Sequence, residues 1–566
     1  VVYQQDPLDF SFARQARPGF VPRPSQLPEE VRRESNPYGF VGRDGPILAL
    51  ERALRRPPAG ILISGLGGVG KTTLARGFIQ WLDATDGLGE GCFWFTFADI
   101  RTAEFVFNRM GETLFGPQFI PLDLDKKVEA LAAAFREHKF LIVWDNLESV
   151  RGIPGTAVAP NLSEADQRLL TRFLDRLRGA PTKVLITSRS PEDWLGNQRR
   201  FLLPLGGLEG EERWDYCTAI LRDLGLRIDR NAPDLVKLMD LLAGHPLAMR
   251  VMLPRLAERP AAWLVEVLRS RLSDLDPDDD EAQARLYATL RFAQESLPAD
   301  VQPLLIPLAL HEGFMVAEYL EVMAQQVDAR WTRARIDDLA EALVAAGLLH
   351  DHGQATFQMH PVLTGFLRSA LLPTAADIAR DTWTRAFVDV MGRVADDLAP
   401  RPLHEQRGGF HYNGANFHHA LGEAERLGIH VGFASLIQAL AAYAQNISNL
   451  EAADGLFERL ASHHRTQGNQ QGEAAALHHL GMIAAERRDF AAAEQWYRRS
   501  LAIKEKQGNE HIAASTYHHL GIIAAERRDF TAAEQWYRRS LATSEKQGDE
   551  HGSAITYHQL GRIAEK

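Results

Sequence analysis

The chain has 566 residues, of which 45% are hydrophobic and 24% are charged, and its formal net charge is −11. This length allows about three to five domains, and the composition excludes a collagen-like, disulfide-stapled or wholly disordered chain. The acidic balance argues against nucleic acid as a partner, because binding to a phosphate backbone needs an excess of basic residues. With two cysteines and no apolar run long enough to span a bilayer, a cytoplasmic protein with no membrane partner is expected.

The first 37 residues are rich in proline, which favours an extended linker over packed structure. The opening segment, residues 1–7, resembles the tail of the caspase-like CHAT domains of bacterial signalling proteins. The chain begins with Val1 and ends at Lys566 inside a repeated unit. We therefore expect that an effector domain precedes the linker and that both ends are cut.

A phosphate-binding loop follows the first apolar run, residues 61–64. Glycines allow main-chain N–H groups to close around phosphate oxygens, and the helix that starts beside them points its positive end at the same anion. In this pattern a lysine neutralises the β- and γ-phosphates, and the next hydroxyl ligates Mg²⁺. The predicted nucleotide-binding residues of this loop are Gly65, Gly67, Gly68, Val69, Gly70, Lys71, Thr72 and Thr73.

Two further apolar runs end in candidate catalytic residues. Residues 140–145 end at Asp145, which we expect on a neighbouring strand as the second Mg²⁺ residue after Thr72. Asn146 follows it, and an amide cannot take a proton from water, so hydrolysis is expected to be slow. Glu148 is either a water-orienting carboxylate or an ordinary loop residue.

The third apolar run, residues 183–187, leads to Arg189. If its strand neighbours the other two, Arg189 lies beside the γ-phosphate and senses it. The alternative is a solvated arginine at the end of a strand.

The order of these motifs resembles the NB-ARC type of the STAND class of signalling ATPases. That resemblance rests on residues 40–44 (FVGRD), the phosphate loop, Asp145-Asn146, residues 187–189 (TSR) and residues 244–248 (GHPLA). It implies that ADP or ATP binds with Mg²⁺, that Val41, Gly42 and Arg43 pack on the adenine, and that Pro246 forms the opposite wall. Residues 357–361 (FQMHP) resemble the family's Met-His-Asp motif, which implies that His360 contacts the β-phosphate of ADP. Pro361 replaces the aspartate of that motif, so an acidic latch is not expected.

The predicted fold class is a multidomain α/β plus α protein: a parallel P-loop sheet, a helical domain, a winged helix and an α-solenoid. Residues 297–370 combine helical patterns with a strand pair at 348–350 and 356–358 joined by a turn at 351–353. This segment has four arginines against nine carboxylates, a net charge of −5, which opposes DNA binding. The expected boundaries are 1–37 for the linker, 38–205 for the nucleotide-binding domain, 206–275 for the helical domain, 276–372 for the winged helix, 373–430 for a helical connector and 431–566 for the repeats.

The C-terminal part repeats itself at an offset of 40 residues. Residues 481–502 and 521–542 differ at two positions only, a periodicity that predicts a stacked solenoid. The spacing of Gly481, Ala493 and Tyr497 matches tetratricopeptide repeats. The repeated arginine pairs, such as Arg498-Arg499, are either an anionic-ligand face or a solvated helix side, and adjacent histidines such as His478-His479 lack the spacing of a metal site.

Together these features predict a signalling switch with slow ATPase activity. ADP holds it inactive, a protein or small ligand engages the repeats, and ATP-bound protomers assemble and activate the effector, in bacterial defence or regulated signalling. The alternatives are a repeat scaffold with permanently bound ADP and a transcription regulator of similar architecture.

Overall fold

The structure is a computed structural model that describes most of the chain. The described residues are 27–32, 38–98, 100–152, 160–273, 281–374, 376–507 and 510–565. They form two compact units, one drawn from residues 1–116, 125–391 and 409–428, the other from residues 117–124, 392–408 and 429–566. The segment that resembles a CHAT domain tail lies outside the described residues. No helix within the described ranges is both long and apolar enough to cross a membrane.

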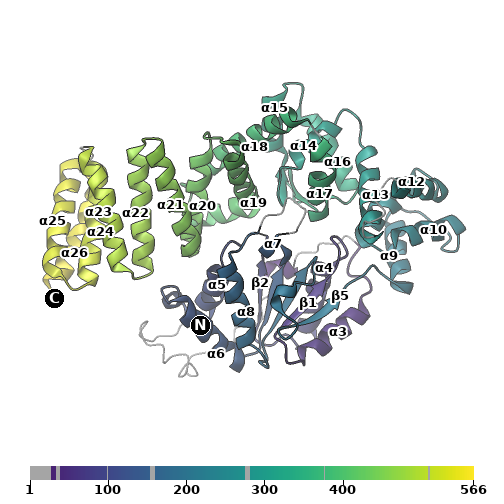
Figure 1. The fold of residues 1–566 in the computed structure, drawn as a ribbon, viewed down its shortest axis with the longest axis horizontal. Coiled ribbons are helices and arrows are strands. Elements are labelled where there is room, and N and C mark those ends of the chain that lie inside the picture. The colour runs from purple at the N-terminus through teal and green to yellow at the C-terminus, as the bar shows by residue number, and fades with distance from the viewer. Residues whose placement is uncertain are drawn as a thin grey trace. The chain divides into compact units, whose positions relative to one another are not determined.

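The first unit contains a five-stranded parallel sheet (Figure 1). Its strands are β1 Gly60–Ser64, β2 Cys92–Thr96, β3 Leu141–Asp145, β4 Lys183–Ser188 and β5 Arg200–Pro204, in the order β2-β3-β4-β1-β5. Every residue of β1, β3 and β4 is buried, as expected for strands that are covered on both faces. Strand β4 separates β1 from β3. The expectation that the strand of Asp145 adjoins the phosphate-loop strand is therefore wrong, because β4 occupies that place.

Helices cover both faces of the sheet. On one face, α3 (Asp44–Leu54) and α4 (Lys71–Ala84) share a core with β1, β3 and β4. An aromatic cluster joins α5 (Ala103–Phe115), α6 (Leu124–Glu137) and α8 (Glu164–Arg176), where the rings of Phe107 and Phe135 each lie against that of Phe173. Burial of such side chains contributes about 1.5–3 kcal/mol each, so the sheet is a firm platform for the loops at its edge.

The predicted linker contains a short helix, α2 (Glu29–Arg32). Val31 is fully buried among residues of α4, and Gln80 Nε2 of that helix donates to the Val31 carbonyl at 2.9 Å. The linker prediction is wrong for these residues, because one apolar side chain anchors the segment on the sheet's helical layer.

The helices described after the sheet are α9 (Gly210–Asp223), α10 (Pro233–Leu242), α11 (Pro246–Met252), α12 (Ala261–Ser273) and α13 (Glu281–Glu295). The break between α10 and α11 falls at Gly244, whose φ is 64° and whose carbonyl accepts from Leu208 N at 2.8 Å. Helix α13 packs on α11 and α12, with the Trp263 and Phe292 rings 6.0 Å apart. It thus extends the helical layer past the expected boundary at residue 275.

The next segment combines helices with a small antiparallel sheet of order β6-β8-β7. Its elements are α14 (Leu305–Leu308), β6 (Phe314–Val316), α15 (Ala317–Val327), α16 (Arg333–Ala345), β7 (Leu349–Asp351), β8 (Thr356–Met359) and α17 (Pro361–Phe366). The predicted hairpin is present as β7 and β8, and β6 adds a third strand that the sequence pattern did not indicate. Two helices before a hairpin give the winged-helix order. Helices α18 (Asp377–Leu398) and α19 (Leu403–Leu427) follow.

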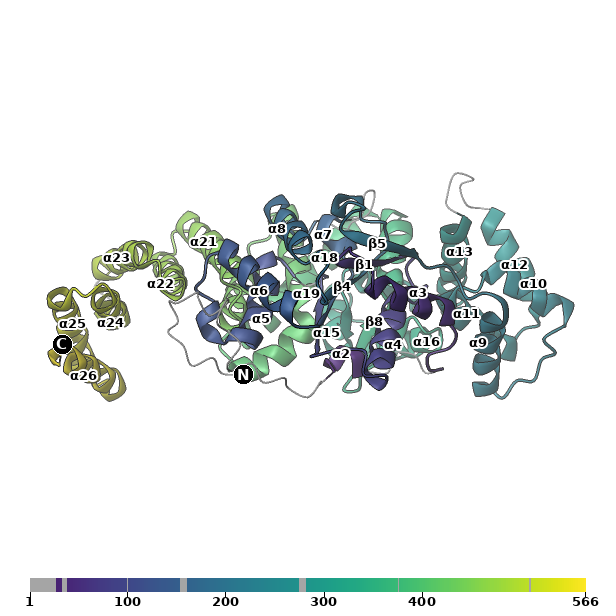
Figure 2. The same cartoon turned by 90° about the horizontal axis from the view of Figure 1, so that it is seen from below.

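The second unit contains a row of antiparallel helices, which Figure 2 shows nearly end-on. They are α20 (Phe433–Asn446), α21 (Leu450–Thr466), α22 (Gln470–Glu486), α23 (Phe490–Lys506), α24 (Glu510–Glu526), α25 (Phe530–Gln547) and α26 (Glu550–Ala564). A Cβ on Gly481 would lie 2.6 Å from the ring of Tyr497, and one on Gly521 would lie 2.5 Å from that of Tyr537. The predicted fold class, a parallel sheet with helical domains and a helical solenoid, is confirmed.

Candidate functional site

The loop between β1 and α4 presents a row of main-chain donors. The N–H groups of Gly67, Gly68, Gly70, Lys71 and Thr72 donate to no acceptor in the part of the chain that the structure describes. Gly68 and Gly70 have φ of 76° and 99°, a region that glycine adopts without a steric penalty. The sequence therefore folds into an anion-binding nest at the start of α4.

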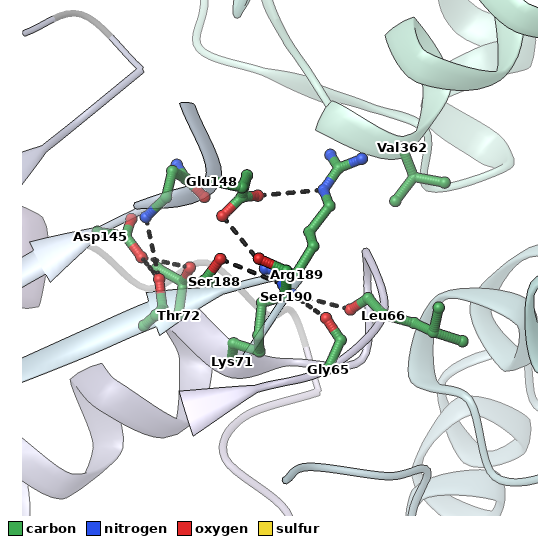
Figure 3. Close-up of polar contacts among 12 residues, drawn as sticks. Gly65, Leu66, Lys71, Thr72, Asp145, Glu148, Ser188, Arg189, Ser190 and Val362 are labelled. Atoms are coloured by element: carbon green, nitrogen blue, oxygen red, sulfur yellow. Dashed lines mark hydrogen bonds and ion pairs between the residues drawn. The ribbon is translucent and has the colours of Figure 1, made fainter. Parts of the chain in front are cut away.

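Lys71 is buried beside this nest, with 8% of its surface exposed. Its Nζ donates to the carbonyls of Gly65 at 2.7 Å and Leu66 at 2.9 Å (Figure 3). Burial lowers the pKa of Lys71 to about 8, while Glu148 and Asp145 raise it and Arg189 lowers it further. An anion at the nest would favour the charged ammonium.

Asp145 ends β3 at the same edge of the sheet. Its Oδ1 accepts from Thr72 Oγ1 at 2.9 Å and from Thr187 Oγ1 at 2.6 Å. Asn146 has a φ of 58°, and its N–H donates to the Thr187 hydroxyl at 3.0 Å. The carboxylate thus contacts Thr72 directly and is held by Thr187 of β4, although β1 and β3 are not neighbours.

Arg189 follows β4, which lies between β1 and β3 and so meets the condition stated for a phosphate sensor. Its Nε lies 3.1 Å from Glu148 Oε1, and its main-chain N–H donates to Glu148 Oε2 at 3.3 Å (Figure 3). The side chain of Glu148 is 9% exposed and that of Arg189 is 30% exposed. In the structure, the Arg189 guanidinium therefore forms a half-buried ion pair with Glu148.

A second carboxylate, which sequence reasoning missed, fixes the turn after Arg189. Glu192 has a φ of 50° and accepts from the hydroxyls of Ser188 and Ser190 and, at 2.6 Å, from Trp194 Nε1. This buried carboxylate is satisfied by three donors, so it acts as a structural anchor. No spacing in the sequence signals it.

The predicted adenine segment is tied to the phosphate loop through Arg43. Its guanidinium donates to the carbonyls of Val69 at 2.8 Å, Gly206 at 2.9 Å and Gly207 at 3.2 Å. Arg43 has a φ of 74°, and its N–H donates to Glu212 Oε1 at 2.7 Å. The side chain thus connects the segment before α3, the loop and the entry to α9.

The helical domain contacts the loop through His245, a residue to which the sequence analysis gave no role. His245 caps α11: its Nδ1 accepts from Ala248 N at 3.3 Å, and its Nε2 lies 3.0 Å from the Gly67 carbonyl. These two contacts require a neutral ring that carries its proton on Nε2. Burial lowers the pKa of His245 to about 4. A Cβ on Gly68 would lie 2.9 Å from Leu247, so α11 packs directly on the loop.

The winged-helix segment reaches the same loop from α17. A Cβ on Gly67 would lie 2.5 Å from Val362 Cγ2. His360 caps α17, with its Nδ1 accepting from Val362 N at 3.2 Å. Burial lowers the pKa of His360 to about 3, and the charges of Arg250, Arg189 and Lys71 lower it as well.

The structure thus brings most of the predicted site residues to one edge of the sheet. Lys71, Thr72, Asp145 and Arg189 surround the nest, with Arg43 and His360 beside it. Pro246 opens α11, but the loop contacts on either side of it are made by His245 and Leu247. Sequence reasoning missed His245, Leu247 and Val362, because a contact between domains leaves no local pattern.

The residues present fit a nucleoside phosphate and a divalent cation. The free N–H groups and the Lys71 ammonium match phosphate oxygens. The Thr72 hydroxyl and the Asp145 carboxylate supply two oxygen atoms 2.9 Å apart, which suit the hard cation Mg²⁺. Among the described residues, no group of three or more His, Cys, Asp or Glu side chains forms another cation site.

The molecule combines a P-loop sheet, helical and winged-helix segments and a repeat solenoid, in the order that the resemblance to STAND ATPases predicted. The tetratricopeptide repeat family model matches residues 474–506 and 513–546, so the chain contains two such repeats. The regulatory protein AfsR of Streptomyces coelicolor is 26% identical over 376 residues, which cover 63% of this chain and 34% of the relative. The chain therefore spans about a third of the length of that curated relative.

Solved structures that are similar at low identity include the following two. A STAND protein with a tetratricopeptide repeat sensor from Pyrococcus horikoshii is 15% identical, with a TM-score of 0.42, covering 93% of this chain and 80% of that one. A Walker-type ATPase of Pyrococcus abyssi is 16% identical, with a TM-score of 0.29, covering 61% of this chain and 98% of that one.

Proposed function

We propose that this protein is a nucleotide-controlled signalling switch of the NB-ARC type. The observation that carries the proposal is the double contact on the phosphate loop: His245 and Leu247 meet it from the helical domain, and Val362 meets it from the winged-helix segment. We call the helical domain and the winged-helix segment the two lids of the phosphate loop. A phosphate that binds or leaves at Gly67 and Gly68 would therefore change the contacts of both lids. Differential affinity of ADP and ATP for the open and closed states supplies the free energy of switching.

Within this proposal the chain's own residues have distinct tasks. Lys71 and the loop N–H groups bind the phosphates, and Thr72 and Asp145 hold Mg²⁺, which when bound neutralises phosphate charge. Arg189 leaves Glu148 when a γ-phosphate offers it a stronger partner. Val41, Gly42 and Pro246 enclose the adenine, and His360 contacts the β-phosphate of ADP. Hydrolysis is slow, since the amide of Asn146 cannot take a proton from water as a carboxylate would.

In this scheme the repeats are the part of the chain to which the triggering ligand binds. A protein or small ligand on the solenoid releases the closed state, ATP replaces ADP, and protomers assemble through their nucleotide-binding domains to activate an effector. The tetratricopeptide repeats support this role, since such solenoids offer extended binding surfaces. Duplex DNA is not a proposed partner, in view of the net charge of −5 on the winged-helix segment.

The first test is nucleotide binding. Calorimetry with ADP and Mg²⁺ should give one site per chain, and Lys71→Met should weaken binding at least a hundredfold because the buried ammonium is lost. Lys183→Met is the matched control: this buried lysine lies at the opposite end of β4 and donates to the carbonyls of Arg56 and Pro58. Binding that survives Lys71→Met, or no binding to the unaltered chain, would refute the proposal.

A second candidate is a repeat scaffold with permanently bound ADP. The enclosure of the loop from two sides favours it, since a nucleotide gripped in this way exchanges slowly. Nucleotide released on denaturation identifies what the chain carries, and exchange against labelled ATP separates the two functions. Retained ADP that never exchanges, with or without partners, would establish the scaffold.

A further inference from the structure

Side chains alternate in direction along a strand, and the end of β4 carries this alternation into the residues that follow it. Thr187 is directed to the nucleotide site, where its Oγ1 donates to Asp145 Oδ1 at 2.6 Å. Arg189 is directed to the same site, with its Nε 3.1 Å from Glu148 Oε1 (Figure 3). A Cβ on Gly67 would lie 3.6 Å from Arg189 Cζ. The guanidinium thus lies beside the phosphate loop.

The side chains on either side of Arg189 are held by one carboxylate. Ser188 and Ser190 both donate their hydroxyls to Glu192 Oε1, the latter at 2.6 Å. Ser188 Oγ also accepts from Ser190 N at 3.2 Å. Ser188 is fully buried and Glu192 is 5% exposed, a setting in which hydrogen bonds to a charged acceptor are strong. Glu192 therefore fixes both neighbours of Arg189 in the chain.

A different residue ties the rest of this turn to the sheet. Arg200 of β5 is 4% exposed, and its guanidinium donates to three groups of the turn. They are the Pro191 carbonyl at 2.8 Å, Asn197 Oδ1 at 2.9 Å and Asp193 Oδ1 at 2.8 Å. Because these bonds do not involve Glu192, loss of its carboxylate should leave the turn attached to the sheet. What Glu192 adds, beside its bond from Trp194, is the placement of the two serines.

We infer that Glu192 is a positioning residue for Arg189 and that it sets how strongly the chain prefers ATP over ADP. When a γ-phosphate draws the guanidinium from Glu148, a fixed main chain requires only the side-chain torsions of Arg189 to change. Without the Glu192 carboxylate, the residues around Arg189 would have to be ordered when the phosphate binds, which would weaken that contact.

ADP has no γ-phosphate, so its affinity should not depend on this placement. The placement itself is seen in the contacts of the serines, whereas its effect on nucleotide preference rests on the proposed function, in which Arg189 senses the γ-phosphate. The inference therefore adds to that function the residue that makes the sensor discriminate.

The test compares the dissociation constants of ADP and of a non-hydrolysable ATP analogue, each with Mg²⁺, by calorimetry on the full chain. In Glu192→Ala the affinity for the ATP analogue should fall about tenfold, whereas that for ADP should not change. A merely structural role would weaken both nucleotides alike. The matched control is Asp193→Asn, which alters an exposed carboxylate of the same turn and should bind both nucleotides as the unaltered chain does.

Ser190→Ala keeps the test decisive if Glu192→Ala folds poorly. Ser190 is exposed, so the variant should fold, and it removes one of the two serine hydroxyls that Glu192 holds. We expect a smaller loss of the same kind, confined to the ATP analogue. Unchanged affinity for the analogue in Ser190→Ala and in Glu192→Ala would overturn the positioning role.

A double-variant cycle separates the positioning role from the sensor itself. Arg189→Met should weaken the ATP analogue selectively, and adding Glu192→Ala to it should cause no further loss, because no guanidinium is left to position. A further loss in the double variant would overturn the inference and leave the sensor in place. If Arg189→Met leaves the ratio of the two dissociation constants unchanged, the sensor is absent, and the inference and that part of the proposed function fail together.

Discussion

Gly67 is the residue at which the phosphate loop meets the winged-helix segment. Alanine at this position places a Cβ 2.5 Å from Val362 Cγ2. Gly67→Ala should therefore displace α17 and weaken the closed state by about 1–3 kcal/mol, as overpacking does elsewhere. Faster release of a fluorescent ADP from the variant, measured by stopped flow, would report this loss.

The compensating change separates a clash with α17 from damage to the loop itself. Val362→Ala removes the methyl group that the new Cβ of Gly67→Ala would meet. The double variant Gly67→Ala, Val362→Ala should release ADP more slowly than Gly67→Ala alone. Equal rates in the two would mean that the loop, and not the contact with α17, is what the extra methyl group disturbs.

His245 makes the contact between the helical domain and the phosphate loop dependent on pH. Its pKa in the folded chain, about 4, lies below the ordinary value of 6.5, so the neutral ring stabilises the fold above pH 6.5. That contribution is lost as the pH falls from 6.5 to 4, by about 3 kcal/mol in all. Chemical unfolding at stepped pH should show a smaller slope over this range in His245→Gln, and an unchanged slope would remove His245 from the account.

At the residue scale, the sequence predicted residues that belong to a local motif and missed residues that meet only in the folded chain. The phosphate loop, Thr72 and Asp145 were predicted from consecutive residues or from a strand end, and in the structure Thr72 and Asp145 are in contact. Arg43 was predicted for the adenine pocket, yet its guanidinium holds three main-chain carbonyls, because these converge only in the folded chain. His245 and Val362 were missed for the same reason.

At the scale of elements, hydrophobic runs predicted the three inner strands and the hairpin. The three-residue strand β6 is too short to show an alternating pattern, and its existence depends on pairing with β8. The order of the sheet was partly wrong, since nothing in consecutive residues indicates that β4 lies between β1 and β3. The helices of the repeats were easier to predict from the sequence, because the duplicated residues show the 40-residue period directly.

The repeats provide a matched series of glycines at one structural position. Gly481→Ala should lower the free energy of unfolding by about 1–3 kcal/mol, because its Cβ would lie 2.6 Å from the buried ring of Tyr497. Gly561, two units of 40 residues further on, has nothing within 4 Å of such a Cβ among the described residues. Gly561→Ala should therefore not lower the free energy of unfolding. The higher helix propensity of alanine should raise it by up to about 1 kcal/mol. Urea unfolding followed by circular dichroism measures both, and equal effects would show that the glycine–tyrosine contact does not stabilise the helix pair.

At the scale of the whole molecule, the proposed switch predicts that opening the lids promotes assembly. The double variant His245→Ala, Val362→Ala lacks one contact from each lid and should form larger species with an ATP analogue without any trigger. Mass photometry of the unaltered chain with ADP should show monomers. The control is Val344→Ala, which changes an exposed valine of the same winged-helix segment. Assembly of the control, or none in the double variant, would contradict control by the lids.

The near-identity of two consecutive repeats has a consequence for how the solenoid can vary in length. Removing residues 481–520 would join Leu480 to Gly521, and the sequence across the new junction would continue as it does in the intact chain. Each hairpin packs on its immediate neighbours, so the shortened row would contain no kind of helix pair that is absent from the longer one. The array can therefore grow or shrink in whole steps of one repeat without a new kind of contact between helices.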